Sequence, residues 1–91
     1  MKCLSILVRG RVQGVFYRAS TKEVALKFGI RGFVRNEPDG NVYIEAVGDD
    51  ITLNKFVEWC RSGPPHAKVT EVQVEEKKEP ANFHSFEIRR S

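Results

Sequence analysis

Two apolar periods alternate along this 91-residue chain, and their order limits the folds that it can adopt. Apolar residues at every second position indicate a strand, whereas apolar residues three and four positions apart indicate a helix. Leu4, Ile6 and Val8 repeat with the first period, which predicts a strand that buries these side chains and ends at Gly10. Four further strands are predicted over residues 30–37, 41–47, 69–74 and 86–89.

The first predicted helix follows the loop after Gly10. Its core-facing side chains are Thr21, Val24, Ala25 and Phe28. Gly29 supplies the left-handed residue that commonly follows a helix C-terminus. The start of the helix stays open by one turn, because Ser20 and Glu23 have the spacing of a capping box while Tyr17 directly follows a loop that contains glycine.

The second predicted helix begins after Asp49 or Asp50, either of which can cap it. Its apolar stripe consists of Leu53, Phe56, Val57 and Cys60. A serine, a glycine and two prolines at 62–65 end it. Cys60 is therefore expected in the core, and Cys3 is expected to point away from the core face of the first strand. A disulfide between them is not expected.

The turn Pro38, Asp39 and Gly40 joins two predicted strands and favours an antiparallel hairpin. The first six predicted elements follow the order strand, helix, strand, strand, helix, strand, which indicates a split βαβ arrangement. The sequence therefore predicts an α+β, ferredoxin-like sandwich in which both helices pack on one face of an antiparallel sheet. Residues 75–82 are expected to form a charged turn before the last strand.

Length and composition indicate a single domain over residues 1–91. Hydrophobic residues make up 41% of the chain, which is enough for one core, but the length leaves no room for a second domain. No stretch approaches the roughly 20 apolar residues of a membrane span, and no signal-peptide core follows Met1. We therefore expect a cytoplasmic monomer without a membrane partner, whose two cysteines are reduced.

Positive charge gathers in the first third of the chain. Residues 1–35 hold eight basic side chains and one acidic side chain, so they carry +7, whereas residues 36–91 carry -4. Such a gradient favours an anionic partner, which could be a nucleic acid, a membrane surface or a small phosphorylated molecule. Charge alone does not choose among these.

The segment 10–18, GRVQGVFYR, links the first strand to the first helix. A loop at this place can aim consecutive backbone N–H groups at one point, because Gly14 widens the range of backbone dihedral angles. Together with the N-terminus of the helix that follows, such a loop can form a concave anion site. Arg18 could clamp two phosphate oxygens with its planar guanidinium. The same residues also fit an ordinary tight turn and a solvated arginine, so the loop by itself does not establish a site.

This loop and the segment GIRGFVRNEPDGNVYIEAVGD resemble the acylphosphatase family, which hydrolyses carboxyl phosphoric anhydrides. The resemblance continues through FVEWCRSGPPHAKVTEV and FEIRR and covers nearly the whole chain. It implies that Arg18 binds the phosphate and that Asn36 positions the attacking water. The residues that it implies for a backbone phosphate cradle are Gln13, Gly14, Val15, Phe16, Tyr17 and Arg18. No metal-ligand spacing, P-loop or dinucleotide fingerprint occurs, so we expect a hydrolase without metal or cofactor that binds an acyl phosphate and inorganic phosphate.

The chain departs from many family members at three positions. Phe16 and Tyr17 stand where many members have a smaller residue followed by phenylalanine, and Glu37 stands where several have threonine or leucine. No departure removes a functional side chain, but together they leave open the shape of the acyl pocket and the acidity near Asn36. Asn36 also precedes a turn, where asparagine is common, so the resemblance is what indicates its role.

The implied reaction needs few residues. The leaving carboxylate is a weak base and requires no general acid, so catalysis reduces to holding the phosphoryl group and aligning water. A neutral Asn36 can orient water but cannot take its proton, and we hypothesise that the proton passes to the phosphate itself. Carbamoyl phosphate, acetyl phosphate and an acylated glycolytic intermediate share the same phosphoryl group, so the sequence does not identify the acyl group.

Two other functions fit parts of the sequence. RNA-recognition domains share this fold class, and residues 31–34 begin like their signature, but Arg35 and Pro38 stand where stacking aromatics are required, so no nucleic-acid partner is expected. A binding relative without catalysis would not need both Arg18 and Asn36. The histidines, His66 and His84, lack ligands at metal-binding spacing and are expected on the surface.

Overall fold

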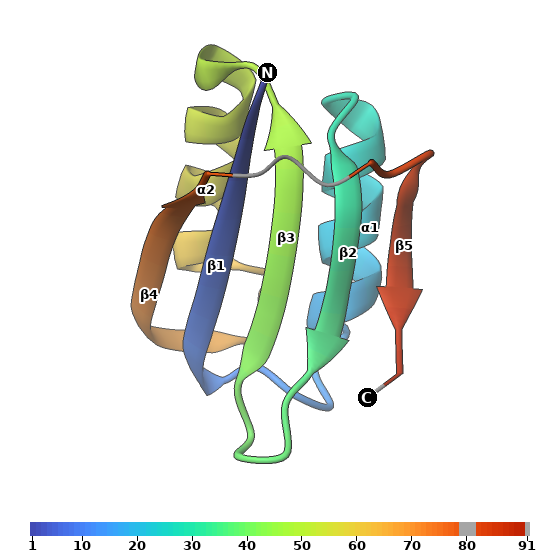
Figure 1. The fold of residues 1–91 in the computed structure, drawn as a ribbon. Helices are drawn as coiled ribbons and strands as arrows, with labels where there is room; N and C mark the ends of the chain where they lie inside the picture. Colours follow the sequence, from blue (N-terminus) through green and yellow to red (C-terminus); the bar gives the residue numbers. More distant parts are fainter. Residues whose placement is uncertain (79–81, 91) are drawn as a thin grey trace.

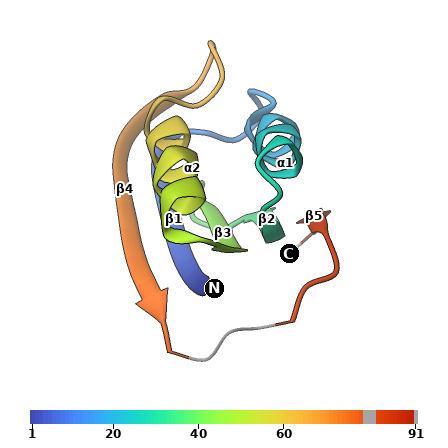
Figure 2. The same ribbon diagram turned by 90° about the horizontal axis from the view of Figure 1, so that it is seen from above.

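The computed structural model describes residues 1–78 and 82–90 as two helices on one face of a five-stranded sheet (Figures 1 and 2). The elements are β1 (Lys2–Arg11), α1 (Tyr17–Lys27), β2 (Arg31–Asn36), β3 (Val42–Gly48), α2 (Asp50–Ser62), β4 (Lys68–Lys77) and β5 (Phe86–Arg89). The order across the sheet is β4-β1-β3-β2-β5. The predicted ferredoxin-like α+β fold is confirmed.

One edge of the sheet differs from the prediction. β1 pairs antiparallel with β3 and β4, and β2 pairs antiparallel with β3, but β5 runs parallel to β2. The segment before β5 reaches the sheet where β2 begins, and there the N–H of Gly32 donates to the carbonyl oxygen of Ser85 at 3.0 Å. β5 therefore continues in the direction of β2 (Figure 1), and the sheet is mixed rather than wholly antiparallel.

β1 and β4 are both longer than the sequence predicts. β1 continues past Gly10 to Arg11, because a register shift just before Gly10 allows pairing with β4 to go on. β4 includes residues 75–77, which the sequence analysis placed in a charged turn, because they pair with residues 3–5 of β1. Backbone pairing between distant segments thus overrides the local charge pattern. Of the predicted turn, residues 79–81 lie outside the described part of the chain.

The core lies between the two helices and the sheet (Figure 2). Leu4, Ile6 and Val8 are buried in it, as their alternation predicts. The helices contribute Tyr17, Thr21, Ala25, Leu53, Phe56 and Cys60. The ring of Phe56 meets that of Phe86 edge to face, with centroids 6.1 Å apart, so α2 and β5 close the core together.

The ends of α2 follow the sequence signals. Of the two candidate caps, Asp49 acts: its Oδ1 accepts a hydrogen bond from the N–H of Thr52 at 2.8 Å. At the other end, the N–H of Gly63 donates to the carbonyl oxygen of Trp59 at 2.8 Å. Cys60 lies in the core, and no disulfide joins it to Cys3, as the parity of the first strand predicts.

Candidate active site

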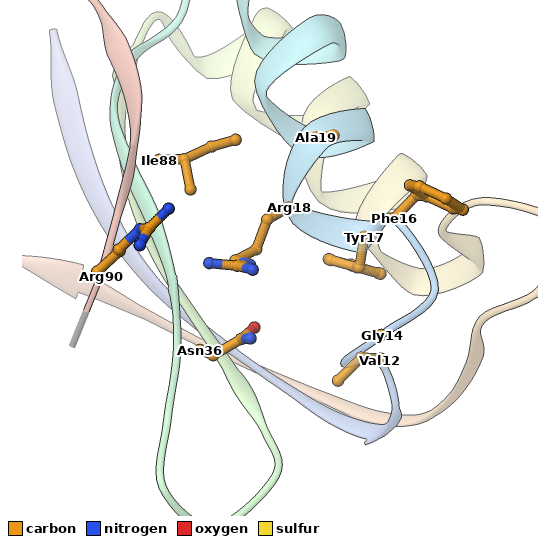
Figure 3. Close-up of a pocket in the computed structure, with 9 residues that line it drawn as sticks. All are labelled: Val12, Gly14, Phe16, Tyr17, Arg18, Ala19, Asn36, Ile88 and Arg90. Carbon is orange, nitrogen blue, oxygen red and sulfur yellow. The ribbon is translucent and has the colours of Figure 1, made fainter.

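A cavity of about 680 Å³ opens at one end of the sheet (Figure 3). This is the end at which β2 and β5 end and α1 begins (Figure 1). Its lining residues are Val12, Gly14, Phe16, Tyr17, Arg18, Ala19, Asn36, Ile88 and Arg90. Within residues 1–78 and 82–90, the only charged side chains that line it are two arginines, and no carboxylate does. The cavity is therefore suited to an anion.

The loop that enters α1 holds two residues in the left-handed region of backbone space. Gly14 has φ 72°, and Phe16 has φ 62° with ψ 21°. Glycine adopts this conformation freely, whereas a residue with a side chain is strained by roughly 1–2 kcal/mol. The side chain of Phe16 is 78% exposed, so packing of its own ring does not impose the conformation. Strain of this kind is typical of turns that bind a ligand.

The N-terminus of α1 is left without a cap. The helix begins at Tyr17, the earlier of the two starts considered, so Ser20 and Glu23 lie inside it and form no capping box. Phe16 precedes the helix without a capping side chain, and the first turn contains no acidic residue. The first N–H groups of a helix lack partners within it, and in the described part of the chain those of residues 16–19 have no other acceptor. Together with the helix dipole they form an anion-binding group of donors.

Arg18 lies in the first turn of α1, and its guanidinium extends across the cavity toward Asn36 (Figure 3). Four other arginines pair with a glutamate: Arg9, Arg35, Arg61 and Arg89. Arg18 has no such partner among the described residues. Its planar donor group is therefore available to two oxygens of a bound phosphoryl group. Of the eight basic residues in the first third of the chain, it is the one that lines this cavity among the residues described.

Asn36 is the last residue of β2, and strand alternation places its side chain on the helix side of the sheet, opposite to Arg35 and Glu37. Its Oδ1 is buried and has no hydrogen-bond partner within residues 1–78 and 82–90. A buried acceptor left in this state costs roughly 1–3 kcal/mol. Because Asn36 lines the cavity, a bound molecule that donates a hydrogen bond to Oδ1 would remove that cost.

Glu37, the acidic residue beside Asn36, is turned away from the cavity. Its Oε2 accepts a hydrogen bond from Nε of Arg35 at 3.1 Å. The guanidinium of Arg35 also stacks 4.9 Å from the centre of the Tyr43 ring, on the face of the sheet without helices. The carboxylate that the sequence left open as a local acid is thus engaged on the opposite face from Asn36.

Tyr17 anchors the start of α1 through its side chain. It is 1% exposed, and its hydroxyl donates to the carbonyl oxygen of Cys60 at 2.8 Å. Burial, with the contact to Cys60, raises the pKa of this phenol well above its usual value, so the hydroxyl remains a donor. The carbonyl belongs to the last turn of α2, where helix carbonyls lack partners. Tyr17 therefore fixes the two helices to each other next to Arg18.

Gln13 and Val15, which the resemblance places in the cradle, do not line the cavity. Val15 packs against the core. The side-chain Nε2 of Gln13 donates to two carbonyl oxygens of the hairpin, those of Glu37 and Asn41, both at 2.8 Å. The sequence offers no signal for these bonds, because they join residues 24 and 28 positions apart.

β5 and the residue directly after it add two cavity residues that the sequence analysis missed, Ile88 and Arg90. Figure 3 shows the guanidinium groups of Arg90 and Arg18 on the same cavity. Both missed residues share the strand face of the buried Phe86, so a two-residue period counted onward from Phe86 would have placed them on the helix side.

The face of the sheet without helices carries a cluster of three aromatic rings, Phe33, Tyr43 and Phe83. Phe33 is 4% exposed, and the guanidinium carbon of Arg89 lies 4.1 Å from its ring centre. Arg35 covers Tyr43 in the same way. Each of the three rings is therefore already in contact with another ring and with a guanidinium group.

The remaining candidate sites stay unassigned. His66 and His84 are exposed, as expected. Among residues 1–78 and 82–90, no group of three or more His, Cys, Asp or Glu residues could hold a metal ion. Within the same residues, neither helix has the length and apolar character needed to cross a membrane.

The chain is similar to acylphosphatases over almost its whole length. A model of the acylphosphatase family matches residues 4–88. An acylphosphatase of Archaeoglobus fulgidus is 51% identical over 88 residues, which cover 97% of this chain and 98% of the relative. The crystal structure of an acylphosphatase from Bacillus subtilis superposes with a TM-score of 0.95 at 39% identity, covering 98% of this chain and 99% of that one. The structure of an acylphosphatase from Coxiella burnetii superposes with a TM-score of 0.92 at 34% identity, covering 97% of this chain and 92% of that one. The chain therefore belongs to the acylphosphatase family.

Proposed function

We propose that this acylphosphatase hydrolyses the bond between phosphorus and the carboxyl oxygen of an acyl phosphate in the cavity beside α1. One observation carries the proposal: the buried Oδ1 of Asn36 and the guanidinium of Arg18 lie on the same cavity, and neither has a partner among the residues that the structure describes. Membership of the family names the reaction. The two side chains supply an acceptor for water and a donor for the phosphoryl group.

The phosphoryl group binds at the N-terminus of α1. The N–H groups of residues 16–19, which have no acceptor in the described part of the chain, donate to phosphoryl oxygens, while Arg18 holds two of these oxygens. The helix dipole adds about 0.3–1 kcal/mol of favourable interaction with the anion. These donors are in place before binding, so their alignment does not have to be created during the reaction.

Asn36 orients the attacking water. The water donates one hydrogen bond to the buried Oδ1, which needs a donor, and thereby turns an oxygen lone pair toward phosphorus. An amide is neutral and does not accept the proton. The contribution of Asn36 is therefore position, which makes the attack in line with the departing carboxyl oxygen.

The reaction then proceeds with few proton transfers. As the water oxygen bonds to phosphorus, the bond from phosphorus to the acyl oxygen breaks, and its electron pair leaves with the carboxylate. A carboxylate is a weak base and needs no general acid. The water proton passes to a phosphoryl oxygen, since Glu37 is held by Arg35 on the other face of the sheet. Arg18 and the helix N–H groups stabilise charge on the equatorial oxygens.

Steady-state hydrolysis of benzoyl phosphate in a metal chelator tests this mechanism. We expect Arg18→Ala to lower turnover on the order of 10³- to 10⁵-fold, by analogy with other arginines that stabilise phosphoryl transfer. Asn36→Ala should lower it roughly 10²-fold or more, which is the effect of misplacing a reacting group by about 1 Å. Inorganic phosphate should inhibit competitively, and Arg18→Ala should weaken that inhibition.

Two exposed residues of α2 provide matched controls, Arg61→Ala and Asn54→Ala. Neither should change turnover, because neither lines the cavity. A folded wild type without turnover, or a folded Arg18→Ala protein with wild-type turnover, would contradict the proposal. We also propose that the protein acts as a monomer, because one chain brings Arg18, Asn36 and the N-terminus of α1 to the same cavity. Turnover per chain should then be independent of protein concentration.

A further inference from the structure

The side chain of Gln13 connects the two parts of the site, which are the loop that leads to Arg18 and the end of β2 that carries Asn36. Gln13 lies in the loop before α1, which carries Arg18, and its Nε2 donates to the carbonyl oxygens of Glu37 and Asn41 at 2.8 Å each. Glu37 directly follows Asn36. The N–H of Glu37 in turn donates to the carbonyl oxygen of Asn41 at 2.8 Å, so these two carbonyls mark the point where β2 and β3 meet at the hairpin.

This connection is needed because the sheet does not place the two parts of the site side by side. The loop with Gln13 continues from β1, whereas Asn36 ends β2, and β3 lies between these strands. Asn36 is the last β2 residue in the ladder with β3, where it pairs with Val42. On its other side β2 pairs with β5, but that ladder ends one residue earlier, at Arg35 and Arg89, so strand pairing holds Asn36 on the β3 side only.

We propose that Gln13 is a positioning residue: its amide fixes the end of β2 against the phosphate loop and so sets the place of Asn36 relative to the bound phosphoryl group. This inference rests on the proposed function, in which Asn36 aligns the water. One NH₂ group reaches two carbonyls, so it locates the end of β2 in two directions. A rearranged hairpin would leave Arg18 and the helix N–H groups in place but move Asn36.

The replacement Gln13→Met tests the inference, since methionine has similar length and no donor. We expect turnover of benzoyl phosphate to fall about 10-fold or more, because small misplacements of a reacting group are costly. The inhibition constant of inorganic phosphate should stay within about twofold of the wild type, because phosphate binding depends on Arg18 and the helix N-terminus. A merely destabilising change would not separate turnover from phosphate affinity in this way.

A double-mutant cycle identifies the residue through which Gln13 acts. In the Asn36→Ala background, Gln13→Met should lower turnover no further, because no amide remains to be positioned. The matched control is Gln73→Met: Gln73 is exposed on β4 and donates only to the side chain of Glu71 among the described residues. It should change neither quantity.

Gln13→Asn guards against loss of the fold. It keeps the amide but shortens the side chain by one methylene, so we expect an intermediate turnover with unchanged phosphate inhibition. Circular dichroism confirms that each variant is folded at the assay temperature. Wild-type turnover in folded Gln13→Met or Gln13→Asn protein, or an equal loss in both Asn36 backgrounds, would refute the inference alone. An inert wild type would refute the proposed function and the inference with it.

Discussion

The hydroxyl of Tyr17 is the part of the structure whose removal has the most clearly defined cost. It donates to the carbonyl oxygen of Cys60 at 2.8 Å in a buried environment. That carbonyl lies in the last turn of α2, so it has no partner from the helix ladder. Tyr17→Phe therefore removes a hydrogen bond and also leaves a buried acceptor without a donor, which costs roughly 1–3 kcal/mol.

For a domain of this size, 1 kcal/mol corresponds to a shift of about 4–8 °C in Tm. A loss of about 2 kcal/mol therefore lowers the Tm by about 8–16 °C. Thermal unfolding followed by circular dichroism measures the shift, and urea unfolding with an unchanged m value shows that the unfolded state is not the cause. The decrease in Tm should be the same at neutral and mildly alkaline pH, because burial raises the pKa of the Tyr17 phenol above its usual value and keeps the hydroxyl protonated.

Tyr43→Phe is the matched control. The hydroxyl of Tyr43 donates to Oε2 of Glu45 at 2.8 Å, but the same oxygen also accepts from Nζ of Lys77 at 2.9 Å. When the Tyr43 hydroxyl is removed, Oε2 of Glu45 still accepts a hydrogen bond from Lys77. We therefore expect Tyr43→Phe to lower the free energy of unfolding by less than about 1 kcal/mol. If Tyr17→Phe lowers the Tm no more than Tyr43→Phe does, the carbonyl of Cys60 does not depend on the hydroxyl and the reasoning is wrong.

Three further changes test other parts of the structure. Gly63→Ala should lower the free energy of unfolding, measured in urea, by roughly 1–3 kcal/mol. An added Cβ would lie 2.7 Å from Cε2 of Tyr17, and Gly63 has a φ of 66°. Unchanged stability would mean that the Tyr17 ring moves aside without cost. Burial acts to raise the pKa of Glu45, but hydrogen bonds from Lys77 and Tyr43 hold this pKa below its usual value. Ionised Glu45 therefore stabilises the fold at pH values above the usual pKa, and this contribution is lost as the pH falls through the folded pKa. The difference in urea stability between wild type and Glu45→Gln should therefore shrink from pH 7 to about pH 3, and a constant difference would exclude this role. Arg90→Ala should raise the KM for an acyl phosphate a few-fold at low salt, because Arg90 is an exposed cation on the cavity. The increase in KM should vanish near 1 M salt, where the Debye length is about 3 Å. An increase that does not depend on salt would point to a direct contact instead.

The resemblance of the loop and hairpin motifs predicted roles for Arg18 and Asn36, and the structure places both residues on one cavity. Neither residue was distinctive by itself, because an arginine after a glycine loop and an asparagine before a turn are common. The start of α1 shows the limit of local signals. Ser20 and Glu23 have the spacing of a cap, yet the helix begins at Tyr17, and no side chain among the described residues caps its first N–H groups.

The sequence alone determined the features that depend on neighbouring residues. Alternation identified the buried face of β1, helical spacing identified the apolar faces of α1 and α2, and the local cap at Asp49 was one of two candidates. These signals are local because a side chain's direction follows from the backbone of the few residues around it.

Tertiary structure alone decided the features that depend on which distant segments meet. Among them are the parallel pairing of β5 with β2, the extension of β4 through residues 75–77, and the placement of Arg90 on the cavity. The bonds from Gln13 to the hairpin belong to the same group, because their acceptors are backbone carbonyls, which every residue carries and no sequence motif marks. The burial of the Asn36 Oδ1 beside this cavity is also a tertiary property, since the residues that line the cavity with it come from distant parts of the chain.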